Sequence, residues 1–398
     1  MPDRTLATDS ASPEAELLAW CCQARQDAGW ADRMRTLARR VLDWERLAEL
    51  AMQHAVLPTV HQSLISAAAD QVPGEQLNHF RKLFSGIERR NFAFTGELLR
   101  LLNLLHVHGI EGIPYRGPVL AAEVYGDLAM RQFGDLDILL HSTDVLAARD
   151  LLVAHGFRPK FTLTPSQERA YLRAQSEYPL LDETGEILVE LHWRFTEQYF
   201  CFPLFPQDLW ERLVPASLEG LEIRSLSPED LLLVLCVHGT KHVWERLGWI
   251  CDVARLLCTH PALDWTPVLE QARALGSERM LLLGLALAGD RLGAPLPAPV
   301  AARLRADAVV GSLADQVWDW LFLEPMERPG DWATWRFHMR ARERWRDRLN
   351  HSVRLATTTT PGDWSMVRLP GVLFPLYYAI RPFRLVKAYG SSLLRRRR

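Results

Sequence analysis

Apolar residues recur every three to four positions along most of this 398-residue chain, a spacing typical of amphipathic helices. The pattern predicts helices over residues 14–106, again over 227–292, and one more over 301–325. A Pro/Ala-rich linker over 293–300 separates the last two segments. Ser227, followed by proline and two acids, is a strong helix start because serine caps a helix and proline fits its first turn.

Between the helical regions, short apolar runs predict strands that alternate with helices. The expected order is strand, helix, strand, helix, strand, which makes a compact α/β unit. The strands are 110–115, 133–141 and 186–195; the helices are 119–125, with Pro118 in its first turn, and a helix capped by Ser142 or Thr143 that ends at His155-Gly156.

Two acids, Asp135 and Asp137, lie inside the apolar run of the second predicted strand. Strand side chains alternate, so both carboxylates project from one face, about 7 Å apart along the chain, and Leu136, Ile138 and Leu140 point to the other. Two acids on one face of a buried strand repel each other and are costly to desolvate. Mg²⁺, which prefers oxygen ligands, removes both costs. The alternative is a strand end with two solvated acids.

The composition gives no global charge argument for nucleic-acid binding, since the formal net charge is −2. Only residues 336–398 are strongly basic, with 15 Lys/Arg against 3 Asp/Glu. The aromatic and basic residues of this tail can contact an anionic membrane surface, or the tail is simply solvated. Six cysteines without a CxxC pair indicate a reducing compartment. No signal peptide and no apolar run of spanning length is apparent, so we expect a cytoplasmic protein.

The α/β segment resembles the DNA polymerase β-like nucleotidyltransferase superfamily, and in particular its branch of bacterial uncharacterised nucleotidyltransferases. The resemblance covers roughly residues 40–290. It is carried by a glycine after a strand, a helix, a D-x-D strand and a later acid, in the segments Tyr115–Ala121, Tyr125–Arg131, Phe133–Leu139, Val189–Trp193 and His238–Asp252.

The resemblance implies an α+β fold, in which a small mixed sheet with helices is flanked by helical regions. We expect five parts. They are a disordered segment over 1–13, an N-terminal helical region over 14–108, the nucleotidyltransferase core over 109–196, a C-terminal helical lobe over 197–325, and a Trp/Arg-rich basic tail region over 326–398.

The resemblance also implies catalytic and metal-binding roles for Asp135, Asp137 and Glu190. Neighbouring strands lie about 4.8 Å apart, so three such carboxylates can surround two Mg²⁺ ions, with Mn²⁺ as a substitute. The expected nucleotide-binding residues are Arg116, Gly117, Arg131, Lys241 and His242. Two departures from the family pattern concern the triphosphate: Pro118 replaces the second small residue of the usual Gly-Gly or Gly-Ser pair and lacks an amide donor, and Arg116 replaces a lysine.

Histidines near these acids allow further interpretations. His192 follows Glu190 on the same strand face and either assists the metal site or is a satisfied strand histidine. His238 and His242 have the spacing of a zinc pair, with Asp252 as a possible third ligand, although the glutamate of H-E-x-x-H is absent. The resemblance instead implies a helix near the cleft, where Lys241 or His242 reaches the nucleotide and Asp252 holds one of these side chains. The remaining alternative is a helix-packing network without a ligand.

The first functional hypothesis is an Mg²⁺-dependent nucleotidyltransferase. It transfers a nucleoside monophosphate from an NTP such as ATP to a hydroxyl acceptor and releases pyrophosphate. The acceptor is a sugar, a small metabolite, a peptide or a protein, because the fold alone does not select it. The second hypothesis is a degenerate fold that binds nucleotides or proteins, favoured by Pro118. The third is a metallohydrolase built on His238, His242 and Asp252.

Overall fold

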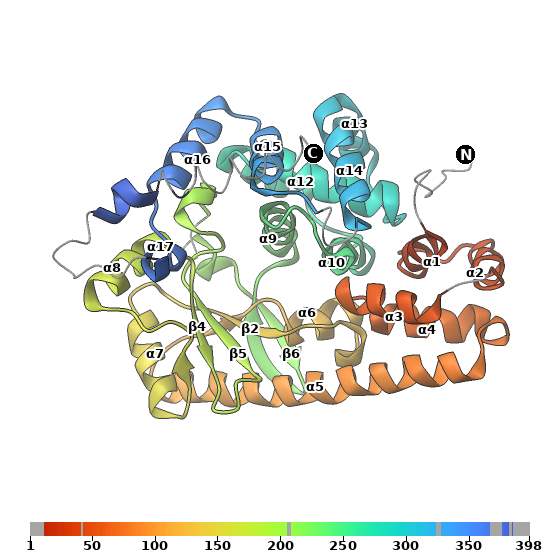
Figure 1. The fold of residues 1–398 in the computed structure, drawn as a ribbon, viewed down its shortest axis with the longest axis horizontal. Coiled ribbons are helices and arrows are strands. Elements are labelled where there is room, and N and C mark those ends of the chain that lie inside the picture. Colours follow the sequence, from red (N-terminus) through yellow and green to blue (C-terminus); the bar gives the residue numbers. More distant parts are fainter. Residues whose placement is uncertain are drawn as a thin grey trace.

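The computed structural model describes residues 12–40, 43–204, 208–323, 328–366, 376–381 and 384. The chain is α+β, as expected: helices surround one five-stranded mixed sheet and a two-stranded hairpin (Figure 1). Most of the segment expected to be disordered, residues 1–11, and the final basic run Arg395–Arg398 lie outside the described residues.

In the described part of the chain, five α-helices precede the sheet, in the region that the apolar spacing predicted to be helical. They are α1 (Pro13–Cys21), α2 (Trp30–Ala38), α3 (Trp44–Gln53), α4 (Leu57–Ala68) and α5 (Gly74–Val107). Helix α5 has 34 residues and runs under both the N-terminal helices and the sheet (Figure 1). It ends at the predicted place, because His108 caps it and Gly109 takes φ 75°, a conformation that glycine adopts without strain.

The sheet has the order β1-β2-β5-β4-β3, in which β2 and β5 run parallel and every other pair is antiparallel. The strands are β1 (Ile113–Pro114), β2 (Asp135–Leu139), β3 (Arg158–Pro159), β4 (Glu177–Leu181) and β5 (Leu188–His192). The three predicted strands are present but shorter. Strand β4 was not predicted, since Pro179 in its centre argues against a strand.

One face of the sheet is packed against helices. Leu136, Ile138 and Leu140 are fully buried there, as the alternation predicted, together with the second half of α5 and α7 (Val145–Ala154). The predicted cap of α7 was wrong: neither Ser142 nor Thr143 is the N-cap, because the turn from His141 to Asp144 delays the helix start by one to two residues. Helices α6 (Pro118–Leu120), continued by a π-helical turn over Ala121–Tyr125, and α8 (Pro165–Ala174) complete the unit.

The hairpin β6 (Val214–Leu218) and β7 (Leu221–Ser225) leads into the C-terminal helices. These are α9 (Pro228–Lys241), α10 (Leu247–Thr259), α11 (Trp265–Leu275), α12 (Glu278–Ala286), α13 (Ala298–Ala306), α14 (Ala308–Leu321), α15 (Asp331–Ala341), α16 (Trp345–Thr357) and α17 (Pro361–Met366). Ser227 caps α9 as predicted, accepting a hydrogen bond from the Asp230 amide. The single helix expected over 301–325 is instead two helices, because Asp307 leaves the helical conformation and caps α14.

Part of the C-terminal segment is built into the fold. Tyr377 is fully buried in the same core as the sheet, so its ring is not available to a membrane surface, whereas Leu376 and Tyr378 are about half exposed. Among the described residues, no helix combines the length and the apolar character that crossing a bilayer requires. The six cysteines are free thiols, and four of them are buried.

Candidate metal and nucleotide site

Asp137 and Glu190 lie side by side at the centre of the sheet. The parallel pairing of β2 and β5 sets Asp137 directly opposite Glu190, and paired residues of neighbouring strands share a face. Asp135 lies two residues before Asp137 on that same face. All three carboxylates line one cleft of about 430 Å³ between the sheet and the C-terminal helices. The structure therefore brings together the three acids that the sequence singled out.

His192 joins this group from the next alternate position of β5. Its Nε2 lies 2.8 Å from Asp137 Oδ1 and 3.5 Å from Glu190 Oε2. One potential ligand atom from each of these three residues lies within 4.8 Å of the others, which is compatible with a shared metal ion. His192 therefore has hydrogen-bonding partners, as the sequence favoured, and it also belongs to the acid cluster.

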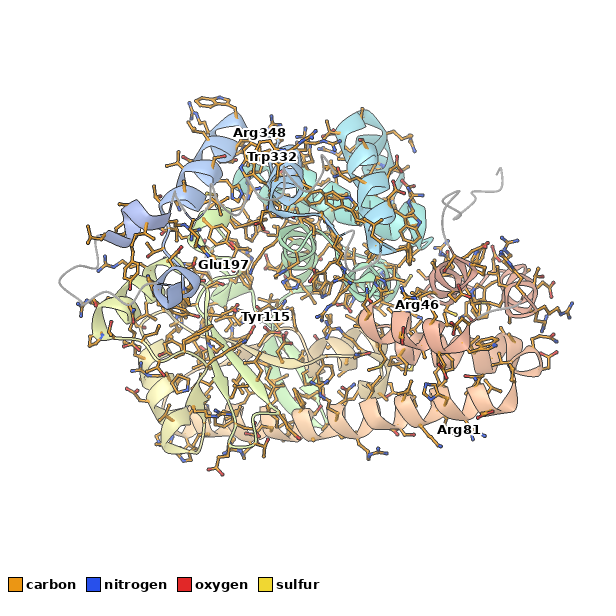
Figure 2. All side chains as sticks on the ribbon, in the orientation of Figure 1. Arg46, Arg81, Tyr115, Glu197, Trp332 and Arg348 are labelled. Carbon is orange, nitrogen blue, oxygen red and sulfur yellow. The ribbon has the colours of Figure 1, made fainter. Side chains whose placement is uncertain are left out.

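Tyr115 fixes the ring of His192 from the side. Its ring packs edge-on against His192 at 5.7 Å between centroids and against Phe195 at 5.5 Å. Figure 2 labels Tyr115 in the interior of the molecule. The fully buried Tyr115 ring restricts the rotation of His192, so that Nε2 stays directed at the acids.

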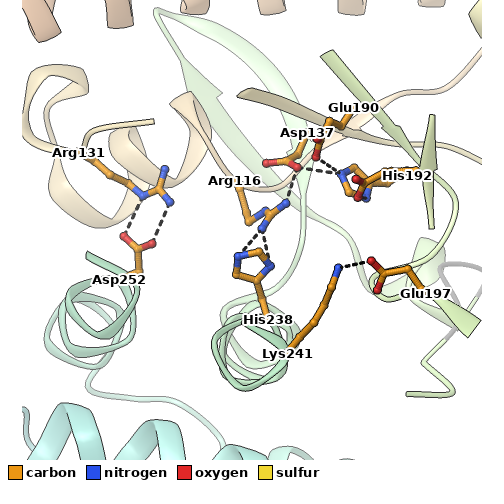
Figure 3. Close-up of polar contacts among 10 residues, drawn as sticks. Arg116, Arg131, Asp137, Glu190, His192, Glu197, His238, Lys241 and Asp252 are labelled. Carbon is orange, nitrogen blue, oxygen red and sulfur yellow. Dashed lines mark hydrogen bonds and ion pairs between the residues drawn. The ribbon is translucent and has the colours of Figure 1, made fainter. Parts of the chain in front are cut away.

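Arg116 neutralises Asp137. Its Nη2 donates to Asp137 Oδ1 at 2.5 Å, and its Nη1 faces the ring nitrogens of His238 at 2.8 and 3.0 Å (Figure 3). Burial alone would raise the pKa of Asp137, but Arg116 and His192 hold it well below its usual range. Asp137 is thus ionised at neutral pH, and two cations balance its charge in the absence of metal.

Three other titratable groups in the cluster have raised pKa values. Burial, reinforced by the Asp137 charge, raises the pKa of Asp135 to about 6. Burial also raises the pKa of Glu177, a further acid that lines the cleft from β4. For His192, burial alone would lower the pKa, but its interactions with Asp137 and Glu190 raise it to about 10. The site is therefore a crowded set of acids held together by Arg116 and imidazolium.

Gly117 occupies a backbone conformation that other residues avoid. Its φ of 57° and ψ of −126° lie outside the regions open to L-residues, and a Cβ there would sit 3.4 Å from the carbonyl oxygen of Asp135. The turn into α6 therefore passes close to the start of β2. Pro118 begins α6, so the amide that the family pattern offers at this position is absent.

Arg131 is held by the C-terminal helices. Its guanidinium makes two hydrogen bonds to Asp252 on α10, at 2.8 and 2.9 Å (Figure 3). Tyr125 donates to the same carboxylate at 2.8 Å. Buried Asn91 on α5 holds the adjoining backbone through the carbonyls of Leu128 and Arg131. The Asp252 prediction was wrong in its partner, because Asp252 binds Arg131 and Tyr125 rather than Lys241 or His242.

Lys241 and His242 also line the cleft, at the end of α9. Lys241 Nζ pairs with Glu197 Oε1 at 3.0 Å (Figure 3), and the His242 ring packs against His238 and Trp249. Burial, with Lys241 and Arg116 nearby, lowers the pKa of His242 to about 3, so its ring is neutral at physiological pH.

The metallohydrolase hypothesis does not fit this arrangement. Across the described part of the chain, the residues that come together as potential ligands are Asp137, Glu190 and His192, and no such group includes His238, His242 and Asp252. Asp252 is already engaged by Arg131, and both nitrogens of His238 face the Arg116 cation.

Several residues of this cleft were not predicted from the sequence. Glu177 and Glu197 were not singled out because β4 was not predicted and the segment after β5 carries no motif. In the hairpin that follows from the turn at residues 182–185, Glu177 pairs with His192 and Pro179 pairs with Glu190, so Glu177 shares the face of the two site residues of β5.

Comparison with known proteins agrees with this geometry. The profile of a family described as "uncharacterised nucleotidyltransferase" matches residues 41–293, and the chain belongs to this family. No curated protein and no solved structure matches the chain.

Proposed function

We propose that the protein is a Mg²⁺-dependent nucleotidyltransferase, which transfers a nucleoside monophosphate from an NTP to a hydroxyl acceptor and releases pyrophosphate. The observation that carries the proposal is the pairing of Asp137 with Glu190 across β2 and β5, with Asp135 on the same face, in an open cleft. Family membership supports the reaction type.

The donor set fits a hard divalent cation. Asp135, Asp137 and Glu190 offer carboxylate oxygens, the ligands that Mg²⁺ prefers, and Mn²⁺ also accepts the His192 nitrogen. Within the described residues, no side chain donates a hydrogen bond to the Asp135 carboxylate, although burial makes its charge costly. A buried carboxylate without a hydrogen-bond donor is stabilised more by a bound cation than a solvated carboxylate is.

The remaining groups position the reactants. When bound, divalent ions would neutralise the phosphate charge and promote ionisation of the acceptor hydroxyl. Arg131 keeps its Nη1 buried and without a partner among the described residues, so one donor remains for an anion while Asp252 fixes the other two. Arg116 carries a further cation at the junction of Asp137 and His238. Glu190 is placed to accept a proton or to hold a cation.

A second candidate function is a nucleotide-binding or protein-interaction module without catalysis. The observation that favours it is the 2.5 Å contact between Arg116 and Asp137, in which the protein supplies its own cation to a carboxylate that the reaction needs for metal. Pro118 points the same way, because it removes an amide donor beside the proposed triphosphate position.

Two measurements test the proposal. Mg²⁺ together with an NTP is expected to raise the melting temperature of the wild type, and the shift is lost in Glu190→Gln. Glu186→Gln, an exposed acid of the same β4–β5 hairpin, is the matched control and keeps the shift. An equal shift in Glu190→Gln would contradict the metal assignment.

Incubation with α-phosphate-labelled NTPs and a cell lysate then tests for transfer. The label is expected on a second molecule with the wild type and not with Glu190→Gln. A Mg²⁺–NTP shift without any transfer of label would favour the non-catalytic module.

A further inference from the structure

A second cavity of about 450 Å³ adjoins the catalytic cleft and differs from it in charge. It is lined by three arginines. Arg246 is shared with the cleft, as are Ala55, Gln132, Phe133, Gly134 and Glu245, whereas Arg90 and Arg328 line this cavity alone. We refer to it as the arginine cavity. Among the described residues that line it, Glu245 is the one acid, so these residues together carry a formal charge of about +2. The cleft itself is dominated by acids.

Two of the three guanidinium groups of this cavity stack on aromatic rings. Arg90 lies over the ring of Phe94 at 4.8 Å, and Arg246 lies over the ring of Trp249 at 5.5 Å. Such stacking fixes the plane of a guanidinium and leaves its N–H edge free to donate. Within the described residues, no carboxylate forms an ion pair with Arg90, Arg246 or Arg328.

Two arginines of the adjoining cleft, in contrast, are paired with carboxylates. Arg116 is paired with Asp137 and Arg131 with Asp252, both inside the cleft. Among the described arginines near the site, those of the arginine cavity are therefore the ones without a carboxylate partner, and they can bind an external anion of two or more charges. Phosphate is such an anion, and its oxygens match the donor geometry of arginine.

A strained loop presents Glu245 and Arg246 to this cavity. Val243 and Trp244, between α9 and α10, have φ values of 48° and 55°, which are unusual for non-glycine residues and costly for valine. Trp244 is fully buried, and its ring packs so closely on Gly239 that a Cβ there would lie 2.5 Å from it. The buried ring thus holds the loop in a conformation that it would otherwise leave.

The cavity is also close to the proposed reaction centre. Gly134 lies on the boundary and directly precedes Asp135, and Arg90 Nη2 is 3.4 Å from the position that a Cβ of Gly134 would occupy. An anion held by Arg90 would therefore lie beside the start of β2.

We propose that the arginine cavity is a phosphate-binding subsite, which holds a phosphate group of a substrate next to the catalytic cleft. The proposed function is needed only to say which substrate carries that phosphate, and phosphate binding itself does not depend on it. Two sources share the chemistry: a phosphorylated acceptor, and the terminal phosphates of the nucleotide. The residues expected to contact the triphosphate, Arg116, Gly117 and Arg131, line the cleft and not this cavity.

Calorimetric titration with inorganic phosphate, in EDTA and at constant ionic strength, tests the subsite. Arg90→Gln and Arg246→Gln are each expected to weaken phosphate binding about tenfold, because each removes charge-assisted hydrogen bonds. Arg89→Gln, an exposed neighbour on α5 outside the cavity, is the matched control and leaves the affinity unchanged. Glu245→Gln is expected to tighten binding. All four positions are exposed, so the variants should fold.

Absent phosphate binding, or equal affinity in the Arg90→Gln/Arg246→Gln variant, would overturn the inference. A repeat titration with Mg²⁺ and a non-hydrolysable NTP analogue identifies the source. Phosphate binding that persists beside the analogue assigns the subsite to the acceptor, and competition by the analogue assigns it to the nucleotide. Because the first titration excludes metal, its result stands whether or not Glu190→Gln abolishes the Mg²⁺–NTP shift.

Discussion

Replacing Asp135 with asparagine should stabilise the metal-free protein while it destroys the metal site. Burial and the Asp137 charge raise the pKa of Asp135 from its ordinary 3.8 to about 6, so its charge destabilises the fold at neutral pH. A pKa rise of this size corresponds to about 3 kcal/mol, at 1.36 kcal/mol per pH unit, which is the ceiling for the gain from Asp135→Asn.

The sign of this effect depends on pH. A raised pKa means that the folded wild type binds the Asp135 proton more tightly than the unfolded chain does. The resulting stabilisation is present below about pH 4 and is lost as the pH rises through about 6. Asparagine carries no charge at any pH, so the variant should exceed the wild type in unfolding free energy near pH 8 and match it near pH 4.

Urea unfolding in EDTA at these two pH values measures the difference in unfolding free energy between the variant and the wild type. The same experiment with Mg²⁺ and NTP measures how much ligand-induced stabilisation the variant has lost. The expected pattern is a higher urea midpoint for Asp135→Asn without metal and a smaller ligand-induced shift with it. A variant that is less stable than the wild type near pH 8 without metal would refute the electrostatic reasoning. A full ligand-induced shift would refute the assignment of Asp135 as a ligand.

Three further predictions concern the surroundings of the site. Gly117→Ala should weaken Mg²⁺–NTP binding about tenfold in a nucleotide titration, since alanine strains the turn beside Asp135; Gly126→Ala, at a left-handed position with open space, is the control. Asp252→Asn should lower the unfolding free energy by about 3 kcal/mol, because the change leaves Arg131 buried and unpaired. A double-mutant cycle with Arg131→Met should show strong coupling between the two residues, and additive losses of stability would contradict the pairing. His54 is buried, and burial, with Arg328 and Arg246, lowers its pKa to about 4. The unfolded chain therefore takes up this proton first, and stability should fall by up to about 3 kcal/mol between pH 6.5 and 4. His54→Gln should flatten that part of the stability–pH curve, whereas exposed His79→Gln should not.

Local pattern was enough to place the acids. The alternation around Asp135 and Asp137 predicted their common face, and Leu136, Ile138 and Leu140 are fully buried as that alternation requires. The pairing of Asp137 with Glu190 depended on a parallel partner 53 positions away, which the family resemblance supplied and periodicity alone did not.

The rest of the site depended on contacts that a local pattern does not contain. Arg116 was expected to meet phosphate, but its partners in the metal-free fold, Asp137 and His238, come from distant elements. Strand β4 was hidden by Pro179, and Glu177 was missed with it. The arginine cavity combines α5, the α9–α10 loop and Arg328, and no motif links these three segments in the sequence.

Helix α5 determines how the two ends of the molecule are oriented relative to each other. Phe80 and Ile87 belong to the core shared by the N- and C-terminal helices, whereas Phe94 and Leu105 belong to the core under the sheet. Each helical residue advances by about 100°, so deletion of one residue between Ile87 and Phe94 would rotate one buried face away from its core. Insertions there would be tolerated only in steps of about seven or eleven residues, which return both faces to register.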